Sequence, residues 1–108
     1  TNQSFYLFQI FKEFSKRRIL GTKQIDSRHY RTTIRNTKRQ TITIEIRDQI
    51  PLSTNKQIEV ESLDISGGTL DEETGEIVWQ VQIAPGQTIT LDNKYEVKYP
   101  KDEFMRID

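Results

Sequence analysis

Hydrophobic and polar residues alternate along most of the chain, and this period of two predicts β-strands. The alternation is clearest in three runs, at residues 41–47, 77–83 and 89–99. It is typical of an antiparallel sheet that buries one face and exposes the other to water. Turn residues separate the runs at short intervals. The sequence therefore predicts an all-β fold, an antiparallel β-sandwich of about seven strands that is immunoglobulin-like or fibronectin type III-like.

The first clear turn predicts how two strands pair. Residues 36–39 separate two β-rich runs, and a hairpin that keeps both apolar rows inward places Ile34 opposite Ile42. The same register sets Arg31 beside Glu45 on the outer face as a cross-strand ion pair. A shift by one residue would expose both apolar rows, so we expect this register to be strongly specified.

A second hairpin turn is predicted at residues 84–87, where Pro85 fixes one backbone angle and Gly86 can adopt a positive φ. Its simplest register places Asn93 opposite Trp79, which is on the buried side of its strand and should anchor the core. A buried amide needs hydrogen-bond partners. Asn93 should therefore lie near an end of the domain or against a crossing backbone.

Two stretches depart from simple alternation. The apolar positions change face between Val60 and Leu63, which predicts a β-bulge or a strand that crosses between sheets. The run Phe5–Phe14 is apolar without a clear period, and either an edge strand over the core or a face toward a neighbouring domain would explain it. Residues 67–75 form a polar, glycine-containing loop that we expect to be the most mobile part of the domain.

The segment Asp48–Ser53 joins two predicted strands. Ile46 ends one inward-facing row and Ile58 begins the next, while Pro51 cannot donate a ladder hydrogen bond. Asp48 is predicted to cap backbone amides of this joint, as short acidic side chains do in turns.

Length and composition restrict the possible classes. A chain of 108 residues forms a single domain, residues 1–108, and its first residue, Thr1, suggests a piece of a longer protein. The 16 basic and 16 acidic residues cancel, which removes the general electrostatic argument for nucleic acid or an anionic membrane. No apolar run approaches the roughly 18 residues of a membrane span, so no membrane insertion is expected. The absence of cysteine excludes disulfides, thiolate metal sites and a cysteine nucleophile.

The candidate catalytic residues are few. His29 is the only histidine and is on the outward side of its strand, so we interpret it as a surface residue. No serine stands in the setting of a nucleophile elbow. The serines from which a triad would have to be assembled are Ser15, Ser27, Ser53, Ser62 and Ser66.

The carboxylates predict solvated surfaces rather than acid–base pairs. Residues 71–73 are adjacent acids in a loop, and Glu59 and Glu61 share one face of a strand. A loose calcium site formed by Asp64 with residues 71–73 is the alternative, although the spacing of an EF-hand is absent. We therefore assign no catalytic, cofactor-binding or metal-binding residue, expect no cofactor, and predict that the domain is not an enzyme.

The densest basic cluster is Lys16-Arg17-Arg18, close to the aromatic residues Phe11 and Phe14. Cations beside aromatic rings can bind single-stranded nucleic acid, but charged edge strands that prevent sheet-to-sheet aggregation are the commoner explanation. We favour the edge strand and expect no nucleic-acid partner. The neighbouring basic residues are Lys12, Lys23, Arg28, Arg31 and Arg35.

Five short motifs follow one another along the chain. They are Asp48–Ser53, residues 58–60, residues 75–79, Pro85-Gly86 and residues 95–102. This series resembles the C-terminal domain of the mucoidy-inhibitor A-like bacterial proteins, a domain of unknown function, over residues 11–102. The resemblance implies a multidomain parent with a helical middle and a β-rich end, an effect on surface polysaccharide, and a location in the cell envelope, in the periplasm or outside the cell. It brings no catalytic residue.

Together these patterns predict a non-catalytic structural or protein-interaction module. The expected partners are another protein or other domains of the same chain, with open strand edges and the N-terminal aromatic segment as contact surfaces. We expect the isolated domain to be monomeric or weakly dimeric. The alternative is a carbohydrate-binding module that acts on envelope glycans; exposed aromatic residues such as Tyr6 or Phe8 would then carry the binding.

Overall fold

A computed structural model describes residues 7–100 of the chain, and the side chains of residues 11–100. All regular structure in this range is β, and the strands pair into two antiparallel sheets, as the alternating pattern predicts. The seven strands are β1 (Leu7–Leu20), β2 (Lys23–Asn36), β3 (Ile42–Gln49), β4 (Glu59–Asp64), β5 (Thr69–Leu70), β6 (Glu76–Ile83) and β7 (Thr88–Pro100). The described residues include no helix that could cross a membrane.

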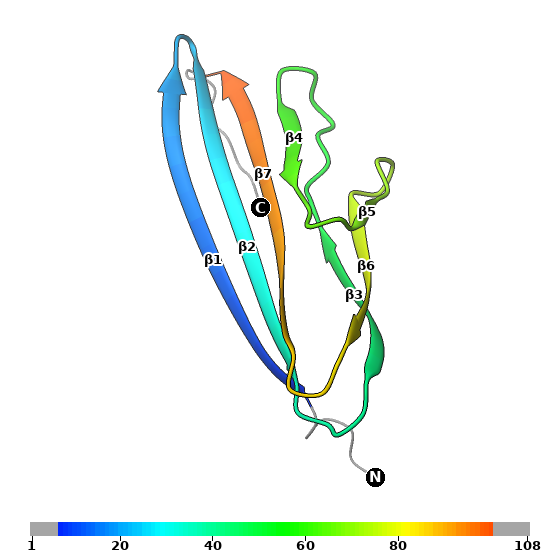
Figure 1. Cartoon of the computed structure of the whole chain (residues 1–108). Helices are drawn as coiled ribbons and strands as arrows, with labels where there is room; N and C mark the ends of the chain where they lie inside the picture. The colour runs from blue at the N-terminus through cyan, green and yellow to red at the C-terminus, as the bar shows by residue number, and fades with distance from the viewer. Residues whose placement is uncertain (1–6, 101–108) are drawn as a thin grey trace.

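The two sheets differ in size. Three long strands and the short β4 form a four-stranded sheet in the order β1-β2-β7-β4, and the other sheet has the order β3-β6-β5 (Figure 1). The last strand, β7, therefore pairs with β2 on one side and with β4 on the other. The connections after β2, β3, β4 and β6 all pass from one sheet to the other.

The hydrophobic core draws on both sheets. Trp79 and Ile77 of β6 belong to one buried cluster with Tyr95 and Val97 of β7, which confirms that Trp79 anchors the core. Alternate residues of β7 supply the other side of the cluster because successive side chains of a strand point to opposite faces. The remaining buried members are Ile50, Leu91 and Tyr99.

The predicted hairpin at residues 36–39 is wrong. Ile34 of β2 lies opposite Ile89 of β7, and Ile42 of β3 lies opposite Ile83 of β6. The segment carries the chain between sheets, so the two apolar rows meet across the core rather than side by side. Alternation is satisfied equally by either arrangement, which is why it did not identify the partner strand.

The predicted ion pair between Arg31 and Glu45 is wrong for the same reason. Arg31 lies opposite Asp92 and donates to its carboxylate, with Nε 2.9 Å from Oδ1. Glu45 lies opposite Gln80 in the other sheet and accepts from Arg47.

A turn does form at residues 84–87, where the Gln87 amide donates to the Ala84 carbonyl at 2.9 Å. It is not a hairpin, because β6 and β7 belong to different sheets. Asn93 therefore does not pair with Trp79 and lies opposite Tyr30 instead. Its side-chain amide donates to the Gln49 carbonyl at 3.4 Å, which confirms the alternative of a crossing backbone.

The two connections at this end of the molecule are fastened to each other by Asn36. Its backbone amide donates to the Gln87 carbonyl at 3.0 Å, and its carbonyl accepts from the Gly86 amide at 2.8 Å. Its fully buried side chain donates to the carbonyls of Gln40 and Ile83 at 2.9 and 2.8 Å. One asparagine thus ties the β2–β3 connection to the β6–β7 connection.

Both predicted irregularities occur. The pairing of β4 with β7 shifts register between Ser62 and Asp64, which confirms a β-bulge where the apolar face changes. From residue 7 on, the N-terminal aromatic segment is part of β1. This strand lies at the edge of its sheet, and an edge strand was one of the two alternatives for the segment. Phe5 and Tyr6 lie outside the described residues.

Candidate functional site at the β1 edge

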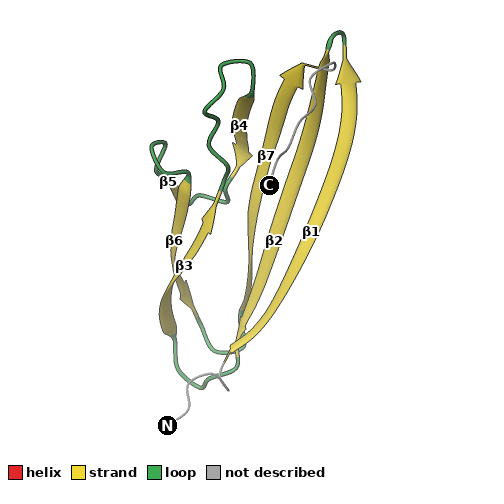
Figure 2. Ribbon diagram, turned by 180° about the vertical axis from the view of Figure 1, so that it is seen from behind, coloured by secondary structure: helices red, strands yellow, loops and turns green. Residues whose placement is uncertain are grey.

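Strand β1 is the part of the domain that its own fold covers least. It has a single neighbour, β2, and every described side chain of the strand, residues 11–20, is exposed. Successive side chains of the strand point to opposite faces, so both of its faces are open. Figure 2 shows β1 as the outermost strand of the larger sheet, far from β3 and β6. Large apolar side chains are exposed along it: Phe11 (56%), Phe14 (46%), Ile19 (57%) and Leu20 (65%).

A tight turn places β1 in this position. The two-residue loop Gly21-Thr22 joins strands of 14 residues each, paired from Leu20↔Lys23 to Leu7↔Asn36. A glycine at the first loop position is the signature of a type II′ hairpin. This signal is present in the sequence and identifies β1 as the partner of β2, but the turns predicted above do not include it.

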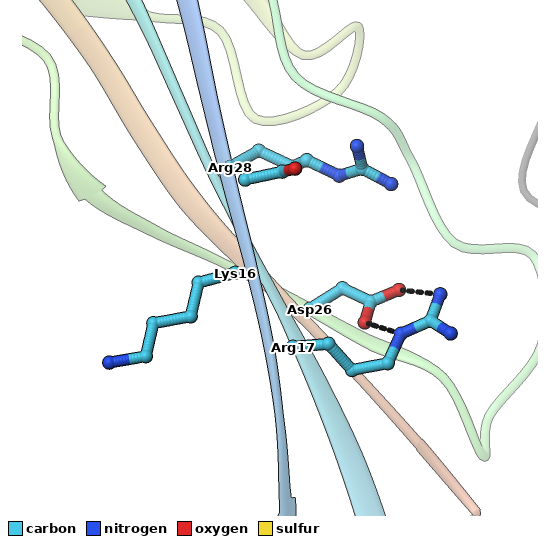
Figure 3. Close-up of a pocket in the computed structure, with 5 residues that line it drawn as sticks. Lys16, Arg17, Asp26 and Arg28 are labelled. Carbon is cyan, nitrogen blue, oxygen red and sulfur yellow. Dashed lines mark hydrogen bonds and ion pairs between the residues drawn. The ribbon is translucent and has the colours of Figure 1, made fainter.

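Arg17 of β1 and Asp26 of β2 join these two strands on the inner face, which is the side of the larger sheet that faces the smaller sheet. Arg17 Nε donates to Asp26 Oδ1 at 2.8 Å, and Figure 3 shows the two side chains on the same side of the sheet while Lys16 points to the other. Asp26 is buried and also accepts from the Tyr99 hydroxyl at 3.1 Å. Burial and this hydrogen bond raise the pKa of Tyr99, so its phenol stays protonated and continues to donate.

Aromatic rings extend the core toward the same edge. The Phe11 ring is stacked on Tyr30 of β2 with centroids 5.8 Å apart, and Tyr30 is stacked on Tyr95 of β7 at 6.1 Å. The row therefore starts in the buried cluster and ends at an exposed phenyl ring.

On the outer face, a second arginine reaches past β2. Arg18 Nη2 donates to Glu96 Oε2 of β7 at 2.9 Å, and Ser27 of β2 donates to the same oxygen at 3.3 Å. Glu96 is nearly buried, so this arrangement supplies the partners that a buried carboxylate needs.

A third group on the outer face contains the single histidine. His29 Nε2 lies 2.6 Å from Asp92 Oδ1, which also accepts from Arg31 Nε at 2.9 Å. Burial alone would raise the pKa of Asp92, but the hydrogen bonds from His29 and Arg31 and the charge of Arg31 outweigh it and lower the pKa below its ordinary value. The Phe14 ring lies 5.1 Å from the His29 ring and 5.9 Å from the Arg31 guanidinium carbon. His29 is therefore a partly buried, paired residue rather than the plain surface residue that its parity suggests.

Beside this group lies a shallow hollow of about 170 Å³. Phe14, Leu63 and the His29 ring form its apolar part, and Lys16 and Lys94 flank it. Both lysines lack a carboxylate partner within the described residues, in contrast to Arg17 and Arg18. The basic cluster predicted from the sequence thus consists of arginines that bind carboxylates of the same sheet and a lysine that has no such partner within the described residues.

The other candidate residues are not brought together. Asp64 accepts from the Ser66 amide at 2.9 Å and Asp71 accepts from the Glu73 amide at 2.9 Å, so each is used in its own turn. Among residues 7–100 no group of three or more side chains is placed to hold a metal, which argues against the calcium alternative there. Glu59 is exposed on β4. Glu61 lies opposite Glu96 of β7 and forms an ion pair with Lys98 at 3.8 Å.

The serines also lie apart. Ser27 donates to Glu96, and Ser66 accepts from the Asp92 amide at 2.8 Å. Ser53 donates to the Asn55 carbonyl, while Ser62 lies in β4 and Ser15 in β1. None of the described hydrogen bonds joins a serine hydroxyl to His29.

The joint at Asp48–Ser53 is a structural contact with the start of β6. The Gln49 amide donates to Asp48 Oδ1 at 2.7 Å, which confirms the predicted capping by Asp48. The Ile50 amide donates to the Gly75 carbonyl at 2.8 Å. Two motifs that are distant in the sequence therefore meet here.

Comparison with known proteins gives the family. The model of the family described as Domain of unknown function (DUF4139) matches residues 9–101, which include nearly all of β1 to β7. The chain belongs to this family. The match bears out the expected domain of unknown function, whereas the mucoidy-inhibitor A-like connection stays a prediction.

The DUF4139 chain is also similar to the protein named Protein F37C4.5 of Caenorhabditis elegans. The two are 27% identical over 89 residues, which cover 71% of this chain and 16% of the worm protein. The chain thus spans less than a fifth of the length of that relative. No solved structure matches the chain.

Proposed function

We propose that this DUF4139 domain is a non-catalytic module that binds a protein partner through strand β1. The observation that carries the proposal is the exposure of every described β1 side chain, residues 11–20, on an edge strand with a single neighbour. An open edge presents unpaired backbone amides and carbonyls, and a partner strand can add to it by main-chain hydrogen bonds.

The composition of β1 supports docking rather than protection alone. Edges that only prevent aggregation are short or interrupted by charge and proline. Strand β1 carries such charges at Lys12, Glu13 and residues 16–18, but it has 14 residues and no proline, and Phe11, Phe14 and Ile19 are each about half exposed. Ion pairs of Arg17 and Arg18 hold the strand against its own sheet, so the edge is ordered before a partner arrives. Preorganisation of this kind lowers the entropy lost on binding.

The titratable groups support a non-catalytic role. The carboxylates of Asp26, Asp92 and Glu96 each accept from an arginine or histidine of another strand of the larger sheet, and these contacts join the strands. A general acid or base instead needs a perturbed pKa at a place that a substrate can reach.

The length of the worm relative supports a role inside a longer protein. A domain that corresponds to 16% of such a chain would have many neighbouring segments, and one of these could be the partner. Among residues 7–100, no contact supports the link to the bacterial envelope and surface polysaccharide that the resemblance implies.

Glycan binding is the weaker candidate. Sugar-binding modules present aromatic rings together on one face, whereas Phe11 and Phe14 are on opposite faces of β1 because their positions differ by an odd number. The Phe11 ring is also stacked on Tyr30. Tyr6 and the side chain of Phe8 lie outside the described parts of the structure.

We further propose that the two sheets pack as a β-sandwich. A core shared by both sheets and a division into four and three strands support an immunoglobulin-like or fibronectin type III-like layout. The strand order differs from the constant-type immunoglobulin order in one exchange, since β7 takes the place of the fifth strand in the larger sheet. An experimental structure with the sheets about 10 Å apart would support this packing.

The interaction is tested by photo-crosslinking in the cells that naturally make the protein. A photoreactive phenylalanine analogue replaces Phe14 in one variant and Leu52, which is equally exposed but outside β1, in the control. The proposal expects crosslinks from position 14 that mass spectrometry maps to one protein segment and that are lost with Ile19→Lys. Equal and scattered crosslinking from positions 14 and 52 would contradict it.

A further inference from the structure

We infer that the partner of β1 is the β1 strand of a second copy, added antiparallel with Ser15 facing Ser15 across a twofold axis. The inference rests on the proposed function and names its partner. The two four-stranded sheets would then form one continuous sheet, and the exposed edge of each copy would be covered by the other.

Symmetry restricts how β1 can pair with itself. Adjacent antiparallel strands of one sheet are related by a twofold axis perpendicular to the sheet, so inner-face residues meet inner-face residues. Residues equally distant from the central residue, in opposite directions, then face each other. Each contact also occurs twice.

The inner face matches in the register centred on Ser15. Glu13 faces the partner's Arg17, which places opposite charges together in both symmetric positions. Glu13 is 51% exposed and lies 4.0 Å from Arg28 Nη1 of its own copy, at the outer limit of an ion pair, and Arg17 is 64% exposed, so both side chains can also reach across the axis. Arg17 uses Nε and Nη2 for Asp26, at 2.8 and 3.5 Å, and its Nη1 donors make no hydrogen bond among the described residues and can bind a second carboxylate.

The next inner-face pair is apolar. Phe11 faces the partner's Ile19, and both are more than half exposed in the single copy. Directly opposed aromatic and β-branched residues are among the favourable cross-strand pairs. The aromatic row from Tyr95 through Tyr30 to Phe11 would thus continue into the second copy instead of ending at the solvent.

The outer face is compatible with the same register. Phe14 faces the partner's Lys16, an arrangement in which the lysine stem packs on the ring and the ammonium group stays in water. Lys12 faces the partner's Arg18, a like-charged pair, but Arg18 is bound to Glu96 at 2.9 Å and its charge is compensated.

Other registers of the described residues are less favourable. A centre at Lys12, Glu13, Lys16, Arg17 or Arg18 places a charged residue directly against its own copy, which is destabilising. A centre at Phe14 sets Lys12 against the partner's Lys16 and leaves Phe11 against the partner's Arg17. A centre near either end of β1 shortens the ladder. Ser15 is the position that combines a long ladder with the Glu13–Arg17 and Phe11–Ile19 pairs.

The approach to the edge is open. In both views of the molecule β1 is the outermost strand of its sheet, with β4 and the smaller sheet at the opposite side (Figures 1 and 2). A second copy can therefore align with β1 without displacing any described strand.

The register is tested by disulfide crosslinking of the purified protein. The chain has no cysteine, so Ser15→Cys introduces a single thiol at the axis. Lys16→Cys is the control for register, and Thr43→Cys, exposed on the edge strand β3, is the control for chance collision. We expect a covalent dimer from Ser15→Cys that forms about tenfold faster than from either control, because only there do the thiols face each other. Equal rates from all three variants would overturn the inference.

The charge pairing is tested by exchange of the two charges, with dimerisation measured by sedimentation. Glu13→Arg and Arg17→Glu each turn two attractive contacts into repulsive ones, and we expect the dimer dissociation constant to rise about tenfold in each. A mixture of the two variants restores attraction in both positions and should form a heterodimer. Because Arg17→Glu also removes the contact with Asp26, melting curves of both variants confirm that they are folded. A mixture that stays monomeric would overturn the register.

The outcomes separate this inference from the proposed function. Photo-crosslinks from position 14 to β1 of the same protein support both. Crosslinks to a different protein, with no dimer of Ser15→Cys, support the interaction module and overturn self-association. An absence of specific crosslinks from position 14, together with a monomeric protein, overturns both.

Discussion

Gly75 explains why the joint Asp48–Ser53 and the start of β6 lie against each other in the fold. Its φ is +78°, and a Cβ added there would lie 2.4 Å from the Ile50 carbonyl oxygen in the joint before β4. The Ile50 amide in turn donates to the Gly75 carbonyl at 2.8 Å. The segment that contains Pro51 can leave β3 only by passing directly against this glycine, so the joint and the start of β6 constrain each other.

We predict that Gly75→Ala lowers the free energy of unfolding much more than Gly86→Ala. Both glycines have nearly the same φ, +78° and +77°, but a Cβ at Gly86 would meet nothing within 4 Å. The left-handed backbone costs each variant about 1–2 kcal/mol. Only Gly75→Ala adds the contact with a backbone carbonyl, for which we expect about 1–3 kcal/mol more. Urea titrations of both variants measure the difference, and equal losses would show that the joint can move away.

Asp92 gives a prediction for the dependence of stability on pH. Its pKa in the folded protein lies below the ordinary value of 3.8, so its contacts with His29 and Arg31 stabilise the fold above about pH 4 and are lost as the pH falls through the folded pKa. We expect Asp92→Asn to be less stable at pH 7, by on the order of 1 kcal/mol. The deficit should shrink below pH 4. Unfolding free energies measured from pH 7 to pH 2 test this, and a deficit that stays constant would contradict it.

At the scale of strands, the sequence predicts elements well and their partners poorly. Alternation identifies β3, β6 and β7 because burial of one face requires it. It cannot say whether Ile34 of β2 meets Ile42 beside it or across the core, and the hairpin predicted at residues 36–39 was wrong for this reason. The Gly21-Thr22 loop is the local signal that would have paired β2 with β1.

The ion pairs of Arg18 and His29 could not be predicted from the sequence because their partners come from other strands. Arg18 and Glu96 are 78 positions apart, and His29 and Asp92 are 63 apart. Parity placed His29 on the outer face, but the acids that bind His29 and Arg18 became known only with the order β1-β2-β7. The exposure of both β1 faces depends on that order too.

We predict that β1 opens before the rest of the larger sheet in dilute solution. Its described side chains from residue 11 to 20 are all exposed, whereas β7 lies between β2 and β4 and supplies Leu91, Tyr95, Val97 and Tyr99 to the core. Local opening of β1 therefore exposes little apolar surface and should require less free energy than global unfolding. Hydrogen exchange measured by NMR should show β1 amides exchanging at least about tenfold faster than those of β7. Equal protection of β1 and β7 in a monomeric sample would contradict this.

At the scale of the molecule, the chain path binds the two sheets into one unit. The chain changes sheet after β2, β3, β4 and β6, and the hydrogen bonds of Asn36 fasten two of these connections to each other. Trp79 in one sheet packs in the same cluster as Tyr95 and Val97 in the other. Neither sheet can separate without exposing this cluster and pulling on its connections.

We therefore predict that both sheets unfold in a single transition. Trp79 is the only tryptophan and is buried, and its Nε1 donates to the Ile65 carbonyl at 2.6 Å, so its fluorescence reports the contact between β6 and the β4–β5 connection. Far-UV circular dichroism reports all strands together, of which the larger sheet contributes most. The two signals should give the same urea midpoint and the same slope, as two-state unfolding requires. If the fluorescence changed at lower urea than the dichroism, the smaller sheet would unfold by itself and the shared core would not be what holds the domain together.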